Sequence, residues 1–177
     1  MAEAAVTIPC YNEADRLNCD AFLGFVREHR DVVFIFVDDG STDKTRQLLE
    51  SMSKTEANNI RLISLGTNRG KAEAVRQGTL SAIAAGARYI GYWDADLATP
   101  LNSILEFISE LKKNSHLLLV MGARVQLLGR TILRKRYRHY LGRVFATVAS
   151  FALGMPVYDT QCGAKMFAAS ESVALAF

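Results

Sequence analysis

The run from Val32 to Val37 constrains the fold more than any other stretch of the chain. Its six residues are all apolar, and each is β-branched or aromatic, which is the composition of a strand. No polar residue alternates with them, so both faces of such a strand would be covered, as in parallel sheets that lie between helices. The run therefore predicts a central strand in an α/β domain.

Comparable runs recur along the chain, separated by helical patterns. The clearest helical pattern follows Pro100, where five apolar residues repeat with a period of 3.6. Strands that alternate with helices at this spacing predict a mostly parallel, doubly wound sheet, which binds ligands beyond the carboxyl ends of its strands. The other predicted strands are Ala4–Pro9, Ile60–Leu65, Arg88–Trp93 and Leu117–Met121.

Polar residues just before the helical patterns indicate where the helices begin. We expect Asn12 to cap the first helix and Ser41 or Thr42 to cap the second. The third helix would open at Asn68–Lys71 and end at Gly86. Its face toward the sheet would consist of small side chains, namely Ala72, Val75, Thr79 and Ala82.

Charge is distributed unevenly along the 177 residues. Residues 1–110 carry 11 Lys and Arg against 16 Asp and Glu, whereas residues 111–158 carry nine Lys and Arg and no acidic residue. Such a basic segment on an acidic body favours an anionic partner, which could be phosphate groups, a membrane surface or nucleic acid. No nucleic-acid-binding module is visible, so we expect no nucleic acid partner.

The cysteines and the apolar runs bear on the compartment. Cys10, Cys19 and Cys162 are odd in number and lack metal-ligand spacing, which favours a reducing compartment. The N-terminus has no signal-peptide layout. The longest uncharged apolar run, Val144–Tyr158, is shorter than the ~20 residues of a membrane-spanning helix. We therefore expect a cytoplasmic protein. The basic segment beside this apolar run favours a peripheral position at the cytoplasmic face of a membrane.

The residues that follow the predicted strands have the chemistry of a nucleotide diphosphate site. Asp94 and Asp96 offer hard oxygen ligands for Mg²⁺ or Mn²⁺, and Arg124 offers a guanidinium for a phosphate. The loops after the first two strands offer acceptors and an aromatic ring, suited to a base and a ribose. No G-x-G-x-x-G follows the first strand and no P-loop sequence occurs, which excludes those two kinds of nucleotide site.

Each of these features has a simpler interpretation. Asp38 and Asp39 are also compatible with a turn before a helix, and Asn68–Lys71 with a simple helix start. The basic segment is also compatible with a solvated face, and Leu141–Met155 with either a core helix or a membrane contact. An Asp-x-Asp phosphohydrolase, with Asp94 as nucleophile and Asp96 as acid, is a further alternative. Against it, the motif follows the fourth predicted strand, not the first.

Five segments in this order resemble the family 2 glycosyltransferases with the GT-A fold. Within that family they are most similar to the polyprenyl-phosphate sugar synthases, and more to the dolichyl-phosphate glucosyl enzymes than to the mannosyl enzymes. The resemblance covers residues 4 to about 170. The segments are Pro9–Glu13, Val37–Asp43, Asn68–Lys71, Asp94–Asp96 and Asp159–Lys165.

The resemblance implies roles for individual residues. Asp94 and Asp96 would hold the metal and, through it, the diphosphate, and both would be catalytic together with Gln161. Arg134, Arg138 and Lys165 would meet the acceptor phosphate. The residues expected to bind the nucleotide sugar are Pro9, Tyr11, Glu13, Val37, Asp39, Lys71, Ala95 and Arg124.

The resemblance also implies a reaction and its partners. The expected reaction moves glucose from UDP-glucose to a polyprenyl or dolichyl phosphate, with inversion, at an anionic membrane surface. The acceptor phosphate is already anionic near neutral pH, so it needs positioning more than a strong base. The alternative is a nucleotide-sugar-binding fragment without turnover.

We expect a single GT-A domain over residues 1–177, shortened at its C-terminus. Residues 1–124 would bind the nucleotide, and residues 125–177 would face the acceptor and the membrane.

Overall fold

The computed structural model describes residues 2–123 and 162–177. Met1–Val120 and Gly163–Phe177 form one compact unit, and Met121–Cys162 form another. The first unit holds nearly all of the described helices and strands. In chain order these are β1 (Ala4–Cys10), α1 (Cys19–Glu28), β2 (Val32–Asp38), α2 (Thr45–Thr55), β3 (Ile60–Ser64), α3 (Lys71–Ala84), β4 (Tyr89–Trp93), α4 (Ser103–Lys113), β5 (Leu119–Met121), β6 (Ala164–Ala168) and α6 (Glu171–Ala176).

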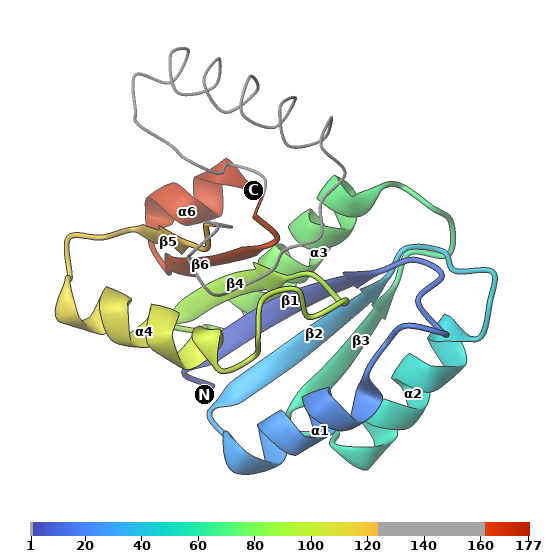
Figure 1. Ribbon diagram of the computed structural model, residues 1–177. Coiled ribbons are helices and arrows are strands. Elements are labelled where there is room, and N and C mark those ends of the chain that lie inside the picture. Colours follow the sequence, from blue (N-terminus) through green and yellow to red (C-terminus); the bar gives the residue numbers. More distant parts are fainter. Residues whose placement is uncertain (1, 124–161) are drawn as a thin grey trace, which may run out of the picture. The chain divides into compact units, whose positions relative to one another are not determined.

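The strands form a six-stranded sheet in the order β3-β2-β1-β4-β6-β5 (Figure 1). β1, β2, β3 and β4 are parallel, and β6 runs antiparallel to β4. This confirms the predicted α/β fold with a mostly parallel sheet flanked by helices. β6 carries no strand signal in the sequence, because its five residues include Lys165 and no β-branched side chain; pairing with β4 makes it a strand.

Val32–Val37 lies in β2, every residue of which is buried, as the unbroken apolar run predicts. On one face of the sheet, the Phe22 ring of α1 meets Phe34 and Phe36 edge-on, with centroids 5.2 and 5.1 Å apart. On the opposite face, Val33 and Ile35 pack in a cluster with residues of α3. Each fully buried side chain of this size contributes about 1.5–3 kcal/mol.

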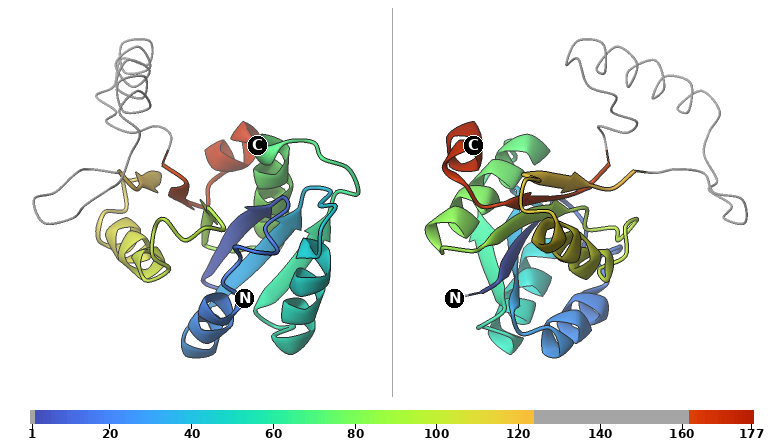
Figure 2. Two further views of the ribbon diagram at one scale, coloured as in Figure 1. Left: turned by 45° about the vertical axis from the view of Figure 1, so that its right-hand side comes forward. Right: turned by 90° about the vertical axis from the view of Figure 1, so that its left-hand side faces the viewer.

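Figures 1 and 2 show α3 on the face of the sheet opposite to α1. It approaches β1 closely, since a Cβ at Gly78 would lie 2.2 Å from Cγ2 of Thr7. The predicted stripe of small residues is confirmed for Val75, Thr79 and Ala82, which are all buried. It is wrong for Ala72, which is exposed because the stripe begins two residues later, at Ala74.

The predicted caps of the first two helices are wrong. Asn18, not Asn12, caps α1 by accepting a hydrogen bond from the Ala21 N–H. α2 begins at Thr45 without a side-chain cap at the preceding Lys44. The polar residues before these helices bind each other across two loops instead, as described below. The predicted end of α3 is confirmed, with Gly86 at a φ of 70° donating its N–H to the Ile83 carbonyl.

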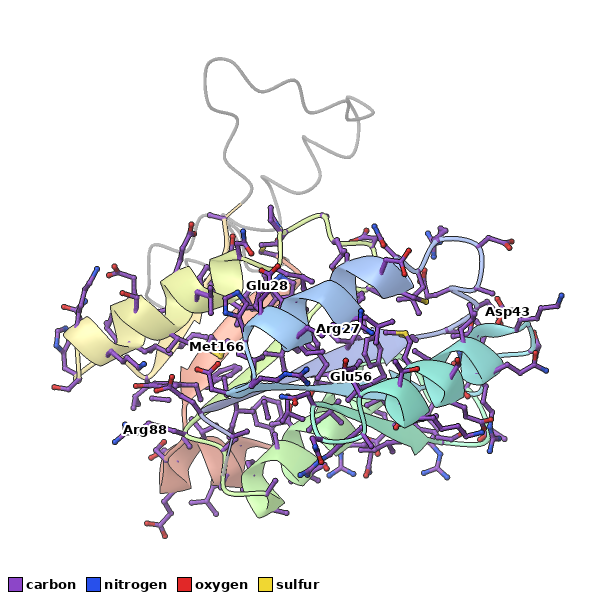
Figure 3. The ribbon with its side chains drawn as sticks, turned by 90° about the horizontal axis from the view of Figure 1, so that it is seen from below. Arg27, Glu28, Asp43, Glu56, Arg88 and Met166 are labelled. Atoms are coloured by element: carbon purple, nitrogen blue, oxygen red, sulfur yellow. The ribbon has the colours of Figure 1, made fainter. Side chains whose placement is uncertain are left out.

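Two arginines fasten the ends of α1 and α2 at the amino edge of the sheet, where the parallel strands begin. Arg27 and Arg30 donate to the two carboxylate oxygens of Glu56, at 2.8 and 2.6 Å. Figure 3 shows Arg27 on α1 and Glu56 beyond the end of α2. Hydrogen bonds from both guanidinium groups lower the pKa of Glu56. At the amino edge of the sheet, the Glu56 carboxylate is thus paired with two guanidinium groups.

Candidate functional site at the carboxyl edge of the sheet

The parallel strands β1, β2 and β4 end at Cys10, Asp38 and Trp93 on the same edge of the sheet. β6 is antiparallel to β4, so its first residue, Ala164, lies at this edge as the register partner of Trp93. The loops that carry the predicted motifs therefore meet here, although they are far apart in the sequence. Gly163 joins them from the far end of the chain.

The loops after β1 and β2 are bound to each other by hydrogen bonds from main-chain N–H groups to side-chain oxygens. The Asn12 N–H donates to Oγ of Ser41, at 3.1 Å, and the Thr42 N–H donates to Oδ1 of Asn12, at 2.9 Å. The Glu13 N–H donates to Oγ1 of Thr45, at 2.8 Å. Asn12 adopts a φ of 54°, a left-handed conformation that Asn tolerates. These bonds fix the two loops that were expected to surround a base and a ribose.

Within these loops, Tyr11 and Glu13 retain groups that a ligand can use. The Tyr11 side chain is 45% exposed, so its ring is open to stacking. Glu13 accepts a hydrogen bond from Arg16 through Oε1, at 2.7 Å. Its Oε2 is buried and has no hydrogen-bond partner among the described residues. An acceptor is therefore left over at the position where the ribose or base was expected.

Cys10 is not a nucleophile in this setting. Burial raises the pKa of its thiol far above the ordinary value, and the nearby Glu13 and Asp38 carboxylates raise it further, with a smaller contribution from Cys19. A thiol in this environment stays protonated, and only a thiolate attacks. Cys10 at the end of β1 therefore offers no covalent step.

Asp39 is nearly buried, at 3% exposure, and holds the loop that precedes α3. Its Oδ1 accepts from the Arg69 N–H at 2.7 Å, and its Oδ2 accepts from the Gly70 N–H at 2.9 Å. The carboxylate lies at the start of α3, where negative charge is favourable. Of the two interpretations of this residue, the structure supports a helix-start role, but for the third helix and not for the second.

Gly40 allows this loop to approach. It has a φ of 71°, and a Cβ there would lie 2.4 Å from the carbonyl carbon of Thr67 and 2.5 Å from the nitrogen of Asn68. Because both neighbours are main-chain atoms, they cannot move aside as a flexible side chain would. Gly40 and Asp39 together set the position from which Lys71 begins α3.

The Asp94–Asp96 segment forms a tight turn beyond β4. The Trp93 indole N–H donates to the Thr99 carbonyl at 3.1 Å, and Oδ1 of Asp96 accepts from the Ala98 N–H at 3.0 Å. Leu97 has a φ of 54°, and Ala95 is buried with 5% exposure. The turn leaves the Asp96 side chain exposed and the Asp94 side chain partly exposed.

Asp94 is held from three directions. Its N–H donates to the Gly163 carbonyl at 2.9 Å. Its Oδ1 forms an ion pair with the ammonium group of Lys71. Its Oδ2 lies against Gly163, where an added Cβ would be only 1.7 Å away. Lys71 and Gly163 are 92 positions apart in the sequence and belong to different motifs, and both fix the same carboxylate.

Lys165 lies two residues farther along the chain, opposite Tyr92 of β4. Its ammonium donates to the Tyr92 hydroxyl at 2.8 Å and lies 5.3 Å from the centre of that ring. The cation expected at the acceptor phosphate is thus at the same edge as Asp94.

The remaining predicted site residues lie within the strands or outside the described residues. The Val37 side chain is fully buried in the cluster beneath α3, so it supports the strand end, and a contact with a nucleotide at this position would come from the main chain. Pro9, its register partner in β1, is half-buried. Arg124, Arg134, Arg138 and Gln161 lie outside the described residues.

The two aspartates fit a divalent cation whose coordination is completed by a ligand. Carboxylate oxygens suit Mg²⁺ and Mn²⁺, and Mg²⁺ commonly takes one or two carboxylates together with phosphate oxygens and water. Within residues 2–123 and 162–177, no group of three or more His, Cys, Asp or Glu side chains could hold a metal. Asp94 and Asp96 would thus supply two protein ligands, and a diphosphate would supply others.

Comparison with known proteins identifies the family. The model of the glycosyl transferase family 2 matches residues 5–171, which is nearly the whole chain. The chain belongs to this family. The predicted membership, based on five short motifs, is confirmed.

Curated relatives in this family share about a third of their residues with the chain. The Dictyostelium discoideum protein named dolichyl-phosphate beta-glucosyltransferase is 34% identical over 177 residues, covering 92% of this chain and 53% of the relative. The human protein of the same name is 31% identical, covering 93% of this chain and 54% of the relative. The chain therefore spans about half the length of these relatives.

Solved structures share the fold at lower identity. A Pyrobaculum calidifontis mannosyltransferase, solved with GDP-mannose and Mn²⁺, gives a TM-score of 0.60 at 20% identity, over 94% of this chain and 44% of that one. A Mycobacterium tuberculosis glucosyl-3-phosphoglycerate synthase, solved with Mn²⁺, UDP-glucose and phosphoglyceric acid, gives 0.63 at 19% identity, over 94% and 57%. The predicted GT-A fold is confirmed by these similarities.

Proposed function

We propose that the chain carries the donor site of a glycosyltransferase that moves glucose from UDP-glucose to a polyprenyl phosphate such as dolichyl phosphate. The observation that carries the proposal is the Asp94 carboxylate, held between Lys71 and Gly163 at the carboxyl edge of a family 2 fold. The names of the curated relatives support the choice of glucose and of the lipid acceptor.

Asp94 and Asp96 would hold a Mg²⁺ or Mn²⁺ ion together with the donor diphosphate. Such an ion, when bound, stabilises the negative charge that builds up on the leaving diphosphate. The chain's own contribution is to orient the two carboxylates through the turn closed by Trp93 and Thr99. Two fold relatives were solved with Mn²⁺, which supports a divalent ion of this kind.

The loops after β1 and β2 would bind the nucleoside. The exposed ring of Tyr11 offers a surface for stacking a base, and the unpaired Oε2 of Glu13 can accept a hydrogen bond from a base N–H or a ribose hydroxyl. Pro9 and Ala95 would supply apolar contacts. Asp39 would act mainly by holding the start of α3, because both of its oxygens already accept main-chain hydrogen bonds.

The acceptor would approach the sugar from the β6 side of this edge. A phosphate oxygen is already anionic near neutral pH, so a nearby cation that positions it matters more than a base. Lys165 is such a cation among the described residues, and we assign Arg134 and Arg138 of the basic segment to the same task. We assign Gln161 to the acceptor side as a catalytic residue, and Arg124 to a phosphate of the donor. Direct attack on UDP-glucose, in which glucose is α-linked, gives a β product by inversion, which agrees with the names of the relatives.

A lipid acceptor also implies work at a membrane. None of the helices in the described ranges is both long and apolar enough to cross one. Independently of that, the nine basic residues within 111–158 would attract the chain to the anionic cytoplasmic surface and hold it there peripherally. Replacing Arg134, Lys135, Arg136 and Arg138 together by Gln should lower co-sedimentation with anionic vesicles, and unchanged co-sedimentation would refute this attachment.

The test of the function separates donor binding from transfer. The chain is incubated with radiolabelled UDP-glucose, Mn²⁺ and dolichyl phosphate in detergent, and label is counted in the lipid phase. Asp96→Asn is the inactive comparison, and Asp31→Asn, at the amino edge, is the matched control. Label that enters the lipid only with metal and with intact Asp96 supports the function. UDP-glucose that fails to bind by calorimetry contradicts it.

A second candidate is a donor-binding chain without turnover, and the coverage of about half of each relative's length favours testing it. It predicts metal-dependent binding of UDP-glucose with no label in the lipid phase. The phosphohydrolase alternative loses its support with the family assignment, since the Asp-x-Asp turn is now part of a glycosyltransferase fold.

A further inference from the structure

The ion pair between Lys71 and Asp94 is not needed to build the edge on which it lies. The Lys71 side chain is 57% exposed and the Asp94 side chain 34% exposed, and ion pairs at such exposure contribute little to stability. The start of α3 is already held by Asp39 through the Arg69 and Gly70 N–H groups. The turn after β4 is already closed by the Trp93 indole. The pair therefore calls for a role in binding.

The ammonium group of Lys71 contacts Asp94, which is one of the two carboxylates that would bind the metal. Oδ1 of Asp94 is taken by Lys71, and Oδ2 lies against the main chain at Gly163. A divalent cation that approached Asp94 would meet a positive charge at its ligand. Two like charges in contact with the same carboxylate repel each other, so binding the ion and the ammonium together at Asp94 costs free energy.

We propose that Lys71 takes the place of the metal ion at Asp94 while the donor is absent, and moves its ammonium onto the diphosphate when the metal and the donor arrive. The inference rests on the proposed donor site and extends it, because it assigns the coupling of metal and nucleotide binding to one side chain. Metal alone binds weakly, since it must displace Lys71. Metal with a nucleotide diphosphate binds well, since the displaced ammonium finds a new anion.

The chemistry of the two groups fits this exchange. A lysine carries a compact charge on a flexible four-carbon stem, so it can turn from one oxygen to another without movement of α3. Asp94 and Asp96 alone supply few ligands, and the described residues contain no larger cluster of metal-ligating side chains. A diphosphate brings oxygen ligands for the ion and negative charge for Lys71 at once. The ion's need for ligands and the ammonium's need for an anion both favour joint binding of the metal and the diphosphate.

The test compares the wild-type chain with Lys71→Met, which keeps the length of the side chain and removes its charge. Free Mn²⁺ is measured by electron paramagnetic resonance during titration, first without and then with saturating UDP. We expect Lys71→Met to bind Mn²⁺ alone about two- to fivefold more tightly, the size expected for removal of an exposed ion pair. We also expect UDP to improve Mn²⁺ affinity less in the variant than in the wild type.

A matched control is available at the opposite edge of the sheet. Lys112 is exposed and pairs with the Glu3 carboxylate at 2.7 Å, so Lys112→Met removes an equivalent ion pair without touching Asp94. Its Mn²⁺ titrations should match those of the wild type with and without UDP. Circular dichroism of all three chains confirms that they are folded.

Two results overturn the inference while leaving the proposed function intact. One is an unchanged or weaker Mn²⁺ affinity in Lys71→Met, which means that the ammonium does not compete. The other is an undiminished effect of UDP, which means that Lys71 does not serve the diphosphate. If the wild type binds neither UDP nor Mn²⁺, the proposed donor site fails and the inference fails with it.

Discussion

The two edges of the sheet use ion pairs in different ways. At the amino edge, Glu56 is 11% exposed at its side chain and is satisfied by two arginines, so every charge has a fixed partner. At the carboxyl edge, Asp94 is three times as exposed, with one lysine as partner, and Asp96 uses a single oxygen for its own turn. The first arrangement joins helices. The second leaves the Asp94 and Asp96 side chains partly or fully exposed, as the proposed donor site requires.

The largest effect on ligand binding should come from Asp96→Asn. Losing a charged ligand should weaken metal-dependent binding of UDP about 10- to 100-fold, because a contact to a charged group contributes about 1.5–3 kcal/mol. Thermal stability should hardly change, because the side chain is exposed. Calorimetry with Mn²⁺ and with a chelator checks this. If UDP binds the wild-type chain equally well with Mn²⁺ and with the chelator, the assignment of a metal to the carboxyl edge is contradicted.

Asp39→Ala should destabilise the carboxyl edge itself. The change leaves the Arg69 and Gly70 N–H groups without their acceptor, and we expect a loss of about 3 kcal/mol in the free energy of unfolding. Urea denaturation measures it. Asp31→Ala, an exposed aspartate at the amino edge, should cost much less. Similar losses in both variants would mean that Asp39 does not hold the start of α3.

Gly163→Ala should disturb Asp94 without removing a charge. The new methyl group would overlap the Asp94 carboxylate, which must then turn away, and metal-dependent UDP affinity should fall about tenfold, or ~1.4 kcal/mol. Binding of UDP without metal should be unaffected. Gly24→Ala is the matched control, because nothing lies within 4 Å of a Cβ at that position. A variant at Gly163 that binds metal and UDP normally would contradict the placement of Asp94.

The smallest effect should come from Glu56→Gln, at the other edge. The two arginines lower the pKa of Glu56, so its stabilising contribution is present above the ordinary pKa of 4.5 and is lost as the pH falls through the lower, folded-state value. The variant should have a slightly lower melting temperature than the wild type at pH 7, and this difference should vanish in acid. UDP binding should be unchanged. A difference that grows in acid would contradict the pairing.

The sequence predicted the parallel strands and the helices between them well, because these elements depend on local patterns. The unbroken apolar run at Val32–Val37 specified a strand buried on both faces, and the period of the helix after Pro100 specified one buried stripe. The strand ends then followed from topology, which brought Asp38 and Asp94 to one edge. Short-range signals and the rules of parallel sheets sufficed for these features.

What the sequence did not reveal depends on contacts between distant segments. β6 is a strand because β4 pairs with it, and Gly163 is needed because the Asp94 carboxylate lies against it. The sequence predicts caps at Asn12 and at Ser41 or Thr42, since these residue types cap helices, but they bind each other's loops instead. Gly163 precedes β6 within the Asp159–Lys165 motif. A glycine at this position indicates a close approach to another segment, but the sequence does not identify that segment.

Paramagnetic broadening by Mn²⁺ in the presence of UDP would test the two-edge account most directly. In amide spectra of the isotope-labelled chain, we expect a low concentration of Mn²⁺ to broaden signals around Asp94–Ala98, Gly163 and Gly70–Lys71, while Arg27, Arg30 and Glu56 stay sharp. Addition of a chelator should restore every signal. Broadening centred on the amino edge, or none near Asp94, would contradict the assignment of the carboxyl edge as the donor site.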